Sequence, residues 1–328
     1  MDTATPGSFI KISGDIVAVK NVSAVTTLND FLIIGSDEGT GTDNKTNCIQ
    51  LLKIKKDGSC KVQHNILVFQ GSNDEGNEMD IEGICTEGDC VYVIGSHSAR
   101  RERLSLNNTY KENQTTFYID KIEKKSSRDW LYRIRLDAKG NEIDKNMISL
   151  RKILMNDPAL KAFCEIPAKE NGINIEGIAA KDGWLYVGFR GPVFRDNYVP
   201  VMKLRFDDPE TTYALLYVQL GGRGIRDLAI VSDGFLILAG PIGGGSDSYQ
   251  VLHWDGKDTV SGKDRSKKEV GTLHLLGEIE PPRKEKIEGM AVIEEQKSAY
   301  QLIIAYDGTK DKDRVLQRFS VNKFTSSS

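Results

Sequence analysis

The sequence predicts an all-β protein that forms a single closed β-propeller with five blades. Three observations carry this prediction: a short apolar motif recurs five times, a second apolar strand follows each copy across a turn, and the two chain ends together complete one repeat. A propeller places such repeats around a central channel, with four strands in each blade. The chain of 328 residues can form one large all-β domain, and residues 1–328 are assigned to one domain.

The repeated motif reads Ile-Glu-Gly followed by Ile or Met, and it begins at Ile81, Ile175 and Ile287. Two diverged copies begin at Val22 and Ile225, where the sequence reads Val-Ser-Ala-Val and Ile-Arg-Asp-Leu. Residues that favour tight turns between antiparallel strands follow the motif strands. In four copies these residues are Asn29-Asp30, Gly88-Asp89, Asp182-Gly183 and Asp233-Gly234.

The chain ends are expected to meet in the last blade. The residues before the first motif and those after the last one together amount to about one repeat. We therefore predict that residues 7–16 pair with residues 314–321. This pairing would remove the open sheet edge that aggregation exploits.

The interval between the second and third motifs is the longest, and it predicts an insertion on the rim of the second blade over residues 100–165. Its first part, residues 100–128, is polar and basic, as expected of a solvated loop. Near its end, Asp157 followed by Pro158 has the pattern of a helix start, which predicts a short helix up to Phe163. The alternative is a sixth blade hidden in this interval.

Composition narrows the function classes. The net charge of −3 gives no global attraction to nucleic acid, and we do not expect nucleic-acid binding. No apolar run reaches the length of a membrane-spanning helix, and the first residues do not resemble a secretion signal. The five cysteines are irregularly spaced without a CxxC pair, which disfavours structural zinc and indicates a reducing, cytoplasmic compartment.

Charged residues recur where the motif strands begin and where the second strands end. In a propeller these positions open on one face, so their side chains are expected to gather at one mouth of the channel. The predicted channel carboxylates, which are also the candidate metal ligands, are Asp80, Glu82, Glu176, Asp227 and Glu288. The predicted anion-binding residues are His97, Arg100, Arg101, Arg190 and Arg226.

Carboxylates that are brought together repel one another unless cations compensate. Either the nearby arginines or a bound Ca²⁺ or Mg²⁺ would supply the positive charge. The competing interpretation is structural: buried glutamates accept backbone hydrogen bonds or pair with arginine and so lock the blades together. The motif glycines, such as Gly83 and Gly177, are expected only to allow close approach of strands. For His97, a solvated surface side chain is the favoured interpretation.

Three runs carry a resemblance to a known family: DIEGI with VYVIGSHSARR, then NIEGIAAKDGWLYVGFRGPV, then GIRDLAIVSDGFLILAGP. Over about residues 20–310 the chain resembles the DUF3616 family, bacterial propeller-like proteins of unknown function. The Glu-Gly-Ile element is also similar to that of phytase-like esterase propellers. The resemblance implies a fold and a site location but no reaction. The chain departs from the pattern at Ser23-Ala24 and at Arg226, so a fivefold ring of carboxylates is broken there.

Two functions remain open. The first is a binding propeller whose partner is a protein or a small anionic ligand, held by the carboxylate and arginine cluster. The second is a hydrolase of phosphate or carboxylic esters, in which the carboxylates hold Ca²⁺ or Mg²⁺ and Arg190 and Arg226 fix the substrate. No Gly-x-Ser-x-Gly motif supports a serine hydrolase.

Overall fold

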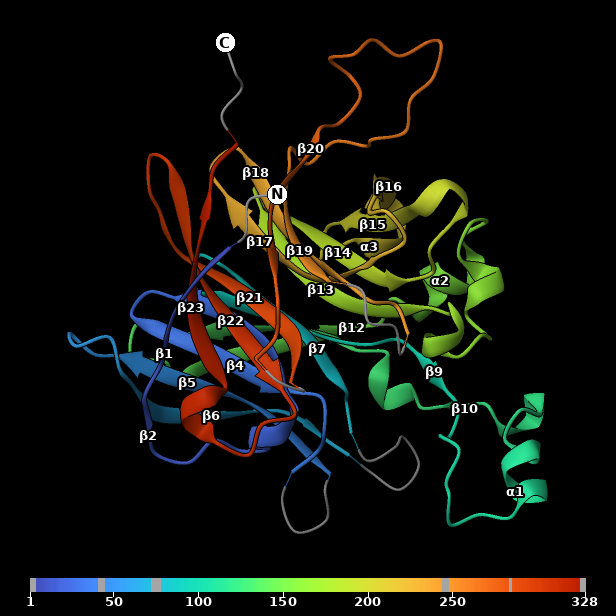
Figure 1. The fold of residues 1–328 in the computed structure, drawn as a ribbon, viewed down its shortest axis with the longest axis horizontal. Helices are drawn as coiled ribbons and strands as arrows, with labels where there is room; N and C mark the ends of the chain where they lie inside the picture. Colours follow the sequence, from blue (N-terminus) through green and yellow to red (C-terminus); the bar gives the residue numbers. More distant parts are fainter. Residues whose placement is uncertain (1–3, 41–44, 72–77, 244–247, 283–284, 325–328) are drawn as a thin grey trace.

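The computed structural model describes residues 4–40, 45–71, 78–243, 248–282 and 285–324 (Figure 1). Five sheets, which we number as blades 1 to 5 in chain order, make up the body of the molecule. The prediction of an all-β, five-bladed propeller is confirmed, and the described residues form no sixth blade. None of the described helices has the length and apolar composition that crossing a bilayer requires.

Each blade begins with one copy of the repeated motif as its innermost strand. The inner strands are β3 (Val22–Leu28), β7 (Ile81–Glu87), β13 (Asn174–Lys181), β17 (Gly224–Val231) and β21 (Lys286–Glu295). The second strands are β4 (Phe31–Ser36), β8 (Cys90–Gly95), β14 (Trp184–Gly191), β18 (Gly234–Gly240) and β22 (Ala299–Asp307). The third strands are β5 (Thr46–Ile54), β11 (Leu131–Leu136), β15 (Tyr198–Leu204), β19 (Tyr249–Trp254) and β23 (Leu316–Asn322). The outer strands are β6 (Cys60–Gln70), β12 (Glu142–Ile148), β16 (Ala214–Gln219), β20 (Leu273–Ile279) and β1 (Thr5–Phe9).

The inner strands surround a central channel. Each inner strand contacts the inner strand of the next blade, and β21 of blade 5 contacts β3 of blade 1. A cavity of about 60 Å³ is lined by residues from all five of these strands. The motif glycines make the close approach possible: a Cβ on Gly177 would lie 3.1 Å from the backbone of Asp227, and one on Gly289 would lie 3.0 Å from the amide nitrogen of Val25.

The N-terminal segment joins the last blade to the first. β1 pairs antiparallel with β23, with Thr5 opposite Ser320. The strand is shorter than the predicted 7–16, because the chain turns to bury Ile10 and Ile12 between blades 5 and 1. Residues Ile12–Ser13 form β2, which pairs in parallel with β6 of blade 1. Through β1 and β2, the N-terminal segment therefore contacts blade 5 and blade 1 at this junction.

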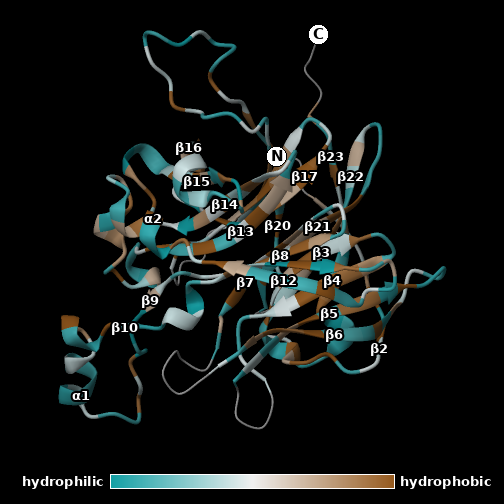
Figure 2. Cartoon of the chain, turned by 180° about the vertical axis from the view of Figure 1, so that it is seen from behind, coloured by the Kyte–Doolittle hydropathy of each residue, from teal (hydrophilic) through white to brown (hydrophobic). Residues whose placement is uncertain are grey.

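Apolar side chains fill the space between blades. The largest buried cluster joins residues of blades 2, 3 and 4, among them Phe189, Phe235 and Trp254. Figure 2 shows that the strands are largely apolar, whereas the long loop between β19 and β20 is largely hydrophilic. Burial of this kind holds each blade rigidly against its neighbours and fixes the positions of the loops at the channel ends.

Residues 100–165 do not form one continuous insertion. β11 and β12 lie within this stretch and complete the sheet of blade 2, and Tyr132, Ile134 and Leu136 of β11 pack in the core between blades. Two segments outside the sheets remain. The first, which we call the arm, is residues 99–128, where β9 (Ala99–Arg100) pairs with β10 (Glu123–Lys124) and α1 (Tyr110–Thr115) projects from the body (Figures 1 and 2).

The second segment, residues 149–173, contains Asp157 and Pro158, where the sequence predicted the start of a short helix. The structure differs from that prediction. An α-helix, α2 (Arg151–Asn156), ends just before Asp157. The Asp157 carboxylate then accepts hydrogen bonds from the backbone N–H groups of Ala159 and Leu160, as a capping residue does. A 3₁₀ turn, Lys161–Phe163, follows it, and a second 3₁₀ turn, Ala168–Glu170, lies further along the segment. The first turn stops at Phe163, because its carbonyl accepts hydrogen bonds from two residues further along the chain.

Candidate functional site: a charged cavity at the channel mouth

A cavity of about 840 Å³ opens where the inner strands begin. We call it the mouth cavity. Its lining includes residues from blades 1, 2, 3 and 5 and from the arm. Of the residues predicted for the site, the structure brings seven to this cavity: Asp80, Glu82, Arg100, Arg101, Glu176, Arg190 and Glu288. Two more of the predicted residues, Arg226 and Asp227, lie beside it, and His97 does not line it.

A buried ion network crosses blades 3, 4 and 5 at the floor of the cavity. Arg226 on β17 is 2% exposed, and its Nη1 lies 2.8 Å from Oε2 of Glu176. Its Nη2 forms a second ion pair with Oε2 of Glu288. On the other side of Glu176, Oε1 accepts hydrogen bonds from Arg190, at 2.7 Å, and from Asn174, at 2.6 Å. We call Glu176, Arg190, Arg226 and Glu288 the floor network.

The floor network neutralises its own charges. Burial lowers the pKa of Arg226, and the carboxylate of Glu176 acts in the opposite direction. A guanidinium group stays cationic in proteins, so Glu176 faces two fixed positive charges. Arg226, which takes the place of the motif glutamate in the fourth repeat, therefore supplies the compensation for the glutamates of blades 3 and 5.

Asp227 has a different role from the other carboxylates. It is 2% exposed, its Oδ1 accepts a hydrogen bond from the amide of Leu228, and its Oδ2 accepts one from the amide of Met290. Both distances are 2.7 Å. Met290 belongs to β21, so Asp227 fastens blade 4 to blade 5. Burial raises the pKa of Asp227, while the two N–H donors act in the opposite direction.

A second matched group lies in blade 2. Arg128, 5% exposed, donates a hydrogen bond to Oε1 of Glu78 at 2.8 Å, and its Nε lies 3.5 Å from Oδ2 of Asp80. The Ser96 hydroxyl also donates to Asp80. The sequence prediction missed Arg128 and Glu78, because Arg128 stands in a basic stretch that reads as a solvated loop.

Besides Glu102, which is exposed on the arm, two carboxylates of the mouth cavity have no such match. Neither Asp37, after β4, nor Glu82, on β7, forms an ion pair with a described residue, and Oδ1 of Asp37 is inaccessible to solvent and accepts no hydrogen bond. Burial, followed by the negative charges of Glu176 and Asp80, raises the pKa of Glu82 well above its ordinary value. Burial likewise raises the pKa of Asp37, with Asp80 as the next cause.

Two cations are equally unmatched within the described part of the chain. Arg103, on the arm, and Lys169, just before blade 3, both line the mouth cavity and are exposed to solvent. Partial burial lowers the pKa of Lys169, and the guanidinium groups of Arg103 and Arg190 lower it further. The cations on this side of the cavity therefore repel one another.

The other arginines of the arm are matched. Arg101 donates to both carboxylate oxygens of Glu170, at 2.6 and 3.2 Å, and to the backbone carbonyls of Thr116 and Tyr118. It therefore fixes the arm to the segment that precedes blade 3. Arg100 pairs with Glu123 at 2.8 Å and lies 3.6 Å from Glu78.

His97 is not the solvated side chain that the sequence favoured. It is fully buried; its Nδ1 lies 2.9 Å from the carbonyl oxygen of Gly95, and the amide of Leu150 donates to its Nε2 at 3.4 Å. Burial lowers the pKa of His97, so the ring stays neutral. This contact with Leu150 gives the ring a structural place between β8 and the segment before α2.

The mouth cavity does not supply a set of metal ligands. No three His, Cys, Asp or Glu side chains among the described residues lie close enough together to hold an ion. The physical reason is that guanidinium groups already occupy the carboxylates of Glu176, Glu288 and Asp80. The expected Ca²⁺ or Mg²⁺ stays a prediction.

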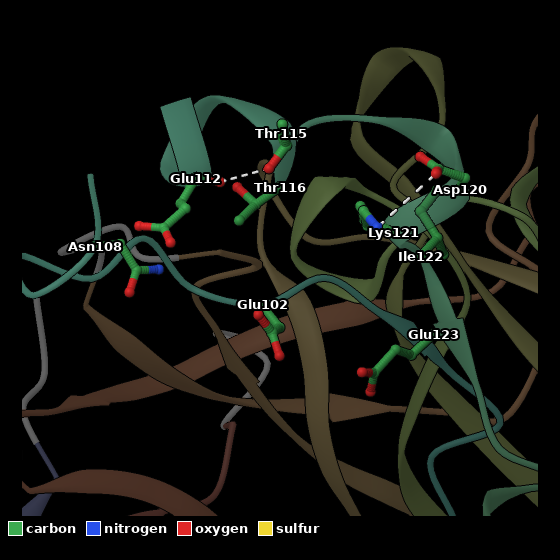
Figure 3. Close-up of a pocket in the computed structure, with 9 residues that line it drawn as sticks. All are labelled: Glu102, Asn108, Glu112, Thr115, Thr116, Asp120, Lys121, Ile122 and Glu123. Atoms are coloured by element: carbon green, nitrogen blue, oxygen red, sulfur yellow. Dashed lines mark hydrogen bonds and ion pairs between the residues drawn. The ribbon is translucent and has the colours of Figure 1, made fainter. Parts of the chain in front are cut away.

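A second cavity, of about 460 Å³, lies in the arm (Figure 3). Its carboxylates have local partners: Glu112 caps α1 through Thr109, and Glu123 pairs with Arg100. Asp120 lies 4.0 Å from the ammonium of Lys121, as the dashed line in Figure 3 marks. The capping box of Thr109 and Glu112 is visible in the sequence, but the sequence prediction missed α1.

These features define the class of protein, a five-bladed β-propeller with a charged cavity at one mouth of its channel. The chain belongs to the family described as "Protein of unknown function (DUF3616)", whose model matches residues 21–322. This match confirms the resemblance to that family. No curated protein matches the chain.

Solved structures with similar folds are distant in sequence. A glucose dehydrogenase is 12% identical with a TM-score of 0.35, and the match covers 90% of this chain and 77% of that one. A GH43 β-1,3-galactosidase is 9% identical with a TM-score of 0.48, covering 98% and 60%. A GH32 β-fructofuranosidase of Bombyx mori is 9% identical with a TM-score of 0.43, covering 96% and 61%. At this distance the matches carry no argument about activity, and none of these three is a phytase-like esterase.

Proposed function

We propose that this propeller binds a small anionic ligand in the mouth cavity. The observation that carries the proposal is the pair Arg103 and Lys169, two cations that line one cavity without an ion-pair partner among the described residues. Partial burial, and then the positive charges of Arg103 and Arg190, lower the pKa of Lys169. An anion placed between these groups would relieve the repulsion and gain charge-assisted hydrogen bonds.

The cavity has the size and lining of a binding site for a small polar molecule. Its volume of about 840 Å³ lies within the usual range for ligand pockets. Rigid blades support the residues on the floor, and the floor network leaves no charge of its own uncompensated. The unmatched charges on the walls are therefore the groups that remain available for a ligand.

A hydrolytic role is the weaker candidate. The carboxylates that would hold a catalytic cation are paired with Arg226, Arg190 and Arg128. An enzyme that uses metal needs such ligands free and converging.

A protein partner is a second candidate, and a separate observation favours it. The arm exposes large apolar side chains, among them Leu106, Tyr110, Phe117 and Ile119. Exposed apolar patches on soluble domains often mark contacts with other proteins. Leu106 and Ile119 do not line the mouth cavity, so replacing these two residues with serine would leave the binding of small anions unchanged.

Calorimetric titration with inorganic phosphate and with a monocarboxylate such as hexanoate tests the proposal. We expect Lys169→Met and Arg103→Met each to weaken binding about tenfold, since each removes one charge-assisted contact. Binding should also weaken as salt is added, because the cations are partly exposed. Lys297→Met is the matched control, because Lys297 is an exposed residue in the turn after β21 and does not line the cavity.

Two results would contradict the proposal. The first is the absence of any binding of phosphate or carboxylate to the wild-type protein at low salt. The second is an affinity for phosphate or hexanoate that is the same in the wild type, Lys169→Met, Arg103→Met and the control Lys297→Met.

A further inference from the structure

Apart from Glu102, which is exposed on the arm, the unmatched charges of the mouth cavity fall into an acidic and a basic group. Asp37 lies in blade 1 and Glu82 in blade 2, and we call these two the acidic wall. Lys169 immediately precedes blade 3, and Arg103 lies on the arm that Arg101 fixes to the same segment; we call these two the basic wall. Blade 1 does not neighbour blade 3 in the ring of inner strands, so Asp37 and Lys169 lie on different sides of the channel mouth.

Each wall lacks a partner for its charge within the described part of the chain. Beside the acidic wall, Asp307 is paired with Lys286 at 2.7 Å and Asp80 with Arg128, but Asp37 and Glu82 have no cation. Oδ1 of Asp37 has neither solvent nor a hydrogen-bond donor, which is a costly state for a carboxylate oxygen. A ligand that brought only a negative charge would satisfy the basic wall and leave the acidic wall without a cation.

We propose that the ligand is a zwitterion, with an ammonium or guanidinium group received by Asp37 and Glu82 and a carboxylate or phosphate group received by Lys169 and Arg103. This inference rests on the proposed function, because it assumes that the same cavity binds an anion. It adds the class of ligand: a molecule with opposite charges at its two ends. Such a ligand would match the charges of Asp37, Glu82, Lys169 and Arg103 at once.

The charges around the two carboxylates support a cationic guest. Glu82 faces the negative charges of Glu176, Asp80 and Asp37, and Arg226 is the cation that acts on it from β17. Asp37 faces Asp80, Asp307, Glu38 and Glu78. These neighbours and burial raise the pKa of both groups, so each retains protons in the free protein at a pH where a solvated carboxyl is ionised. Arrival of a cation would lower their pKa again and release protons.

A ligand series of matched length tests the inference by calorimetric titration. The probes are 6-aminohexanoate, which carries both charges, hexanoate, which lacks the ammonium, and adipate, which replaces it with a second carboxylate. Four-carbon and eight-carbon ω-amino acids bracket the distance between the walls. We expect the best ω-amino acid to bind at least about tenfold more tightly than the monocarboxylate of equal length, and the dicarboxylate to bind more weakly than either.

Variants of the acidic wall give the decisive comparison. We expect Glu82→Gln and Asp37→Asn each to weaken binding of 6-aminohexanoate about tenfold and to leave binding of hexanoate unchanged or tighter. Titration in two buffers of different ionisation enthalpy should show proton release with 6-aminohexanoate, and less of it in Glu82→Gln. Glu294→Gln is the control, since Glu294 is an exposed carboxylate on β21 that does not line the cavity.

The outcomes separate this inference from the function on which it rests. If hexanoate and phosphate bind but ω-amino acids of every length bind no better, the zwitterion is wrong and anion binding stands. If Glu82→Gln and Asp37→Asn, both folded by circular dichroism, bind 6-aminohexanoate as the wild type does, the inference is also overturned. If no probe binds, the proposed function fails and the inference fails with it.

Discussion

Two sets of carboxylates surround the same channel mouth in opposite electrostatic states. Glu176 and Glu288 pair with Arg226, and Asp227 accepts two backbone hydrogen bonds. Asp37 and Glu82 lie a blade or two away and have no cation among the described residues. The floor network and Asp227 hold neighbouring blades together, whereas the unmatched pair lines a cavity that a ligand can enter.

The difference shows how a propeller can use one repeated position for two purposes. Equivalent positions in the motif carry Glu82, Glu176, Arg226 and Glu288. Where the fourth repeat places arginine, its two neighbours are neutralised and become structural. The second repeat is not adjacent to that arginine in the ring, so its glutamate keeps an unmatched charge.

The largest expected effect comes from breaking the floor network at Glu176. Glu176→Gln leaves Arg226 and Arg190 buried with one carboxylate fewer, and loss of one partner in a buried ion pair costs about 3–5 kcal/mol. We expect the free energy of unfolding, measured in denaturant, to fall by about this amount. The loss should be the same with added Ca²⁺ or Mg²⁺ and with chelator, because arginine supplies the compensating charge.

Glu102→Gln provides the comparison for Glu176→Gln. This surface change should alter the free energy of unfolding by less than about 0.5 kcal/mol. A Glu176→Gln protein as stable as the wild type would show that the floor network is not structural. A loss seen only in the presence of a divalent cation would show that metal, rather than arginine, balances the carboxylate.

A smaller loss is expected at Asp227. In Asp227→Asn the amide oxygen can accept one hydrogen bond, but its NH₂ group faces the amide of Leu228 or Met290 and leaves that donor unpaired. An unpaired buried donor costs about 1–3 kcal/mol. Denaturant unfolding would measure the loss, and faster hydrogen exchange in β17 and β21 would place it at the junction of blades 4 and 5.

Asp182→Asn is the control for the same chemical change on the surface. Asp182 is exposed in the β13–β14 turn with a φ of 55°, a conformation that asparagine adopts readily. Equal stability of Asp227→Asn and Asp182→Asn would contradict the role of Asp227 in joining the blades.

The arrangement of the inner strands could be predicted because it depends on short sequence motifs that recur along the chain. Three of the five motifs combine apolar residues with a glycine, and in four copies a turn such as Asp182-Gly183 follows within a few residues. A rotation then places equivalent residues around one axis, which is why Glu82, Glu176 and Glu288 reach the same cavity. The repeat of the motif is therefore enough to predict which residues lie at the channel mouth, and no long-range contact needs to be known.

The pairing of charges could not be predicted in the same way. Arg128 and Glu78 are 50 residues apart in sequence, and a charged residue in a basic stretch reads as solvated. His97 is buried in part by the segment of Leu150, whose amide donates to its ring, although the two residues are 53 positions apart in sequence. Asp227 could not be oriented from its place in the motif, since its partner Met290 lies in the next blade. Such choices depend on packing between blades, which the motif does not encode.

The smallest expected effect on stability, and the only stabilising one, is that of replacing Glu82. Its pKa is raised in the folded protein, mainly by burial, so the folded state retains a proton that the unfolded chain releases. This group therefore costs no stability below the unfolded pKa of about 4.3, and its cost grows as pH rises towards the folded pKa. Glu82→Gln removes that cost. We expect wild type and Glu82→Gln to melt together near pH 4, and the variant to melt at a higher temperature by pH 8. The control Glu102→Gln should follow the wild type at both values. A variant that is less stable than the wild type at pH 8 would mean that the Glu82 carboxylate is matched after all, and the contrast between the two sets of carboxylates would not hold.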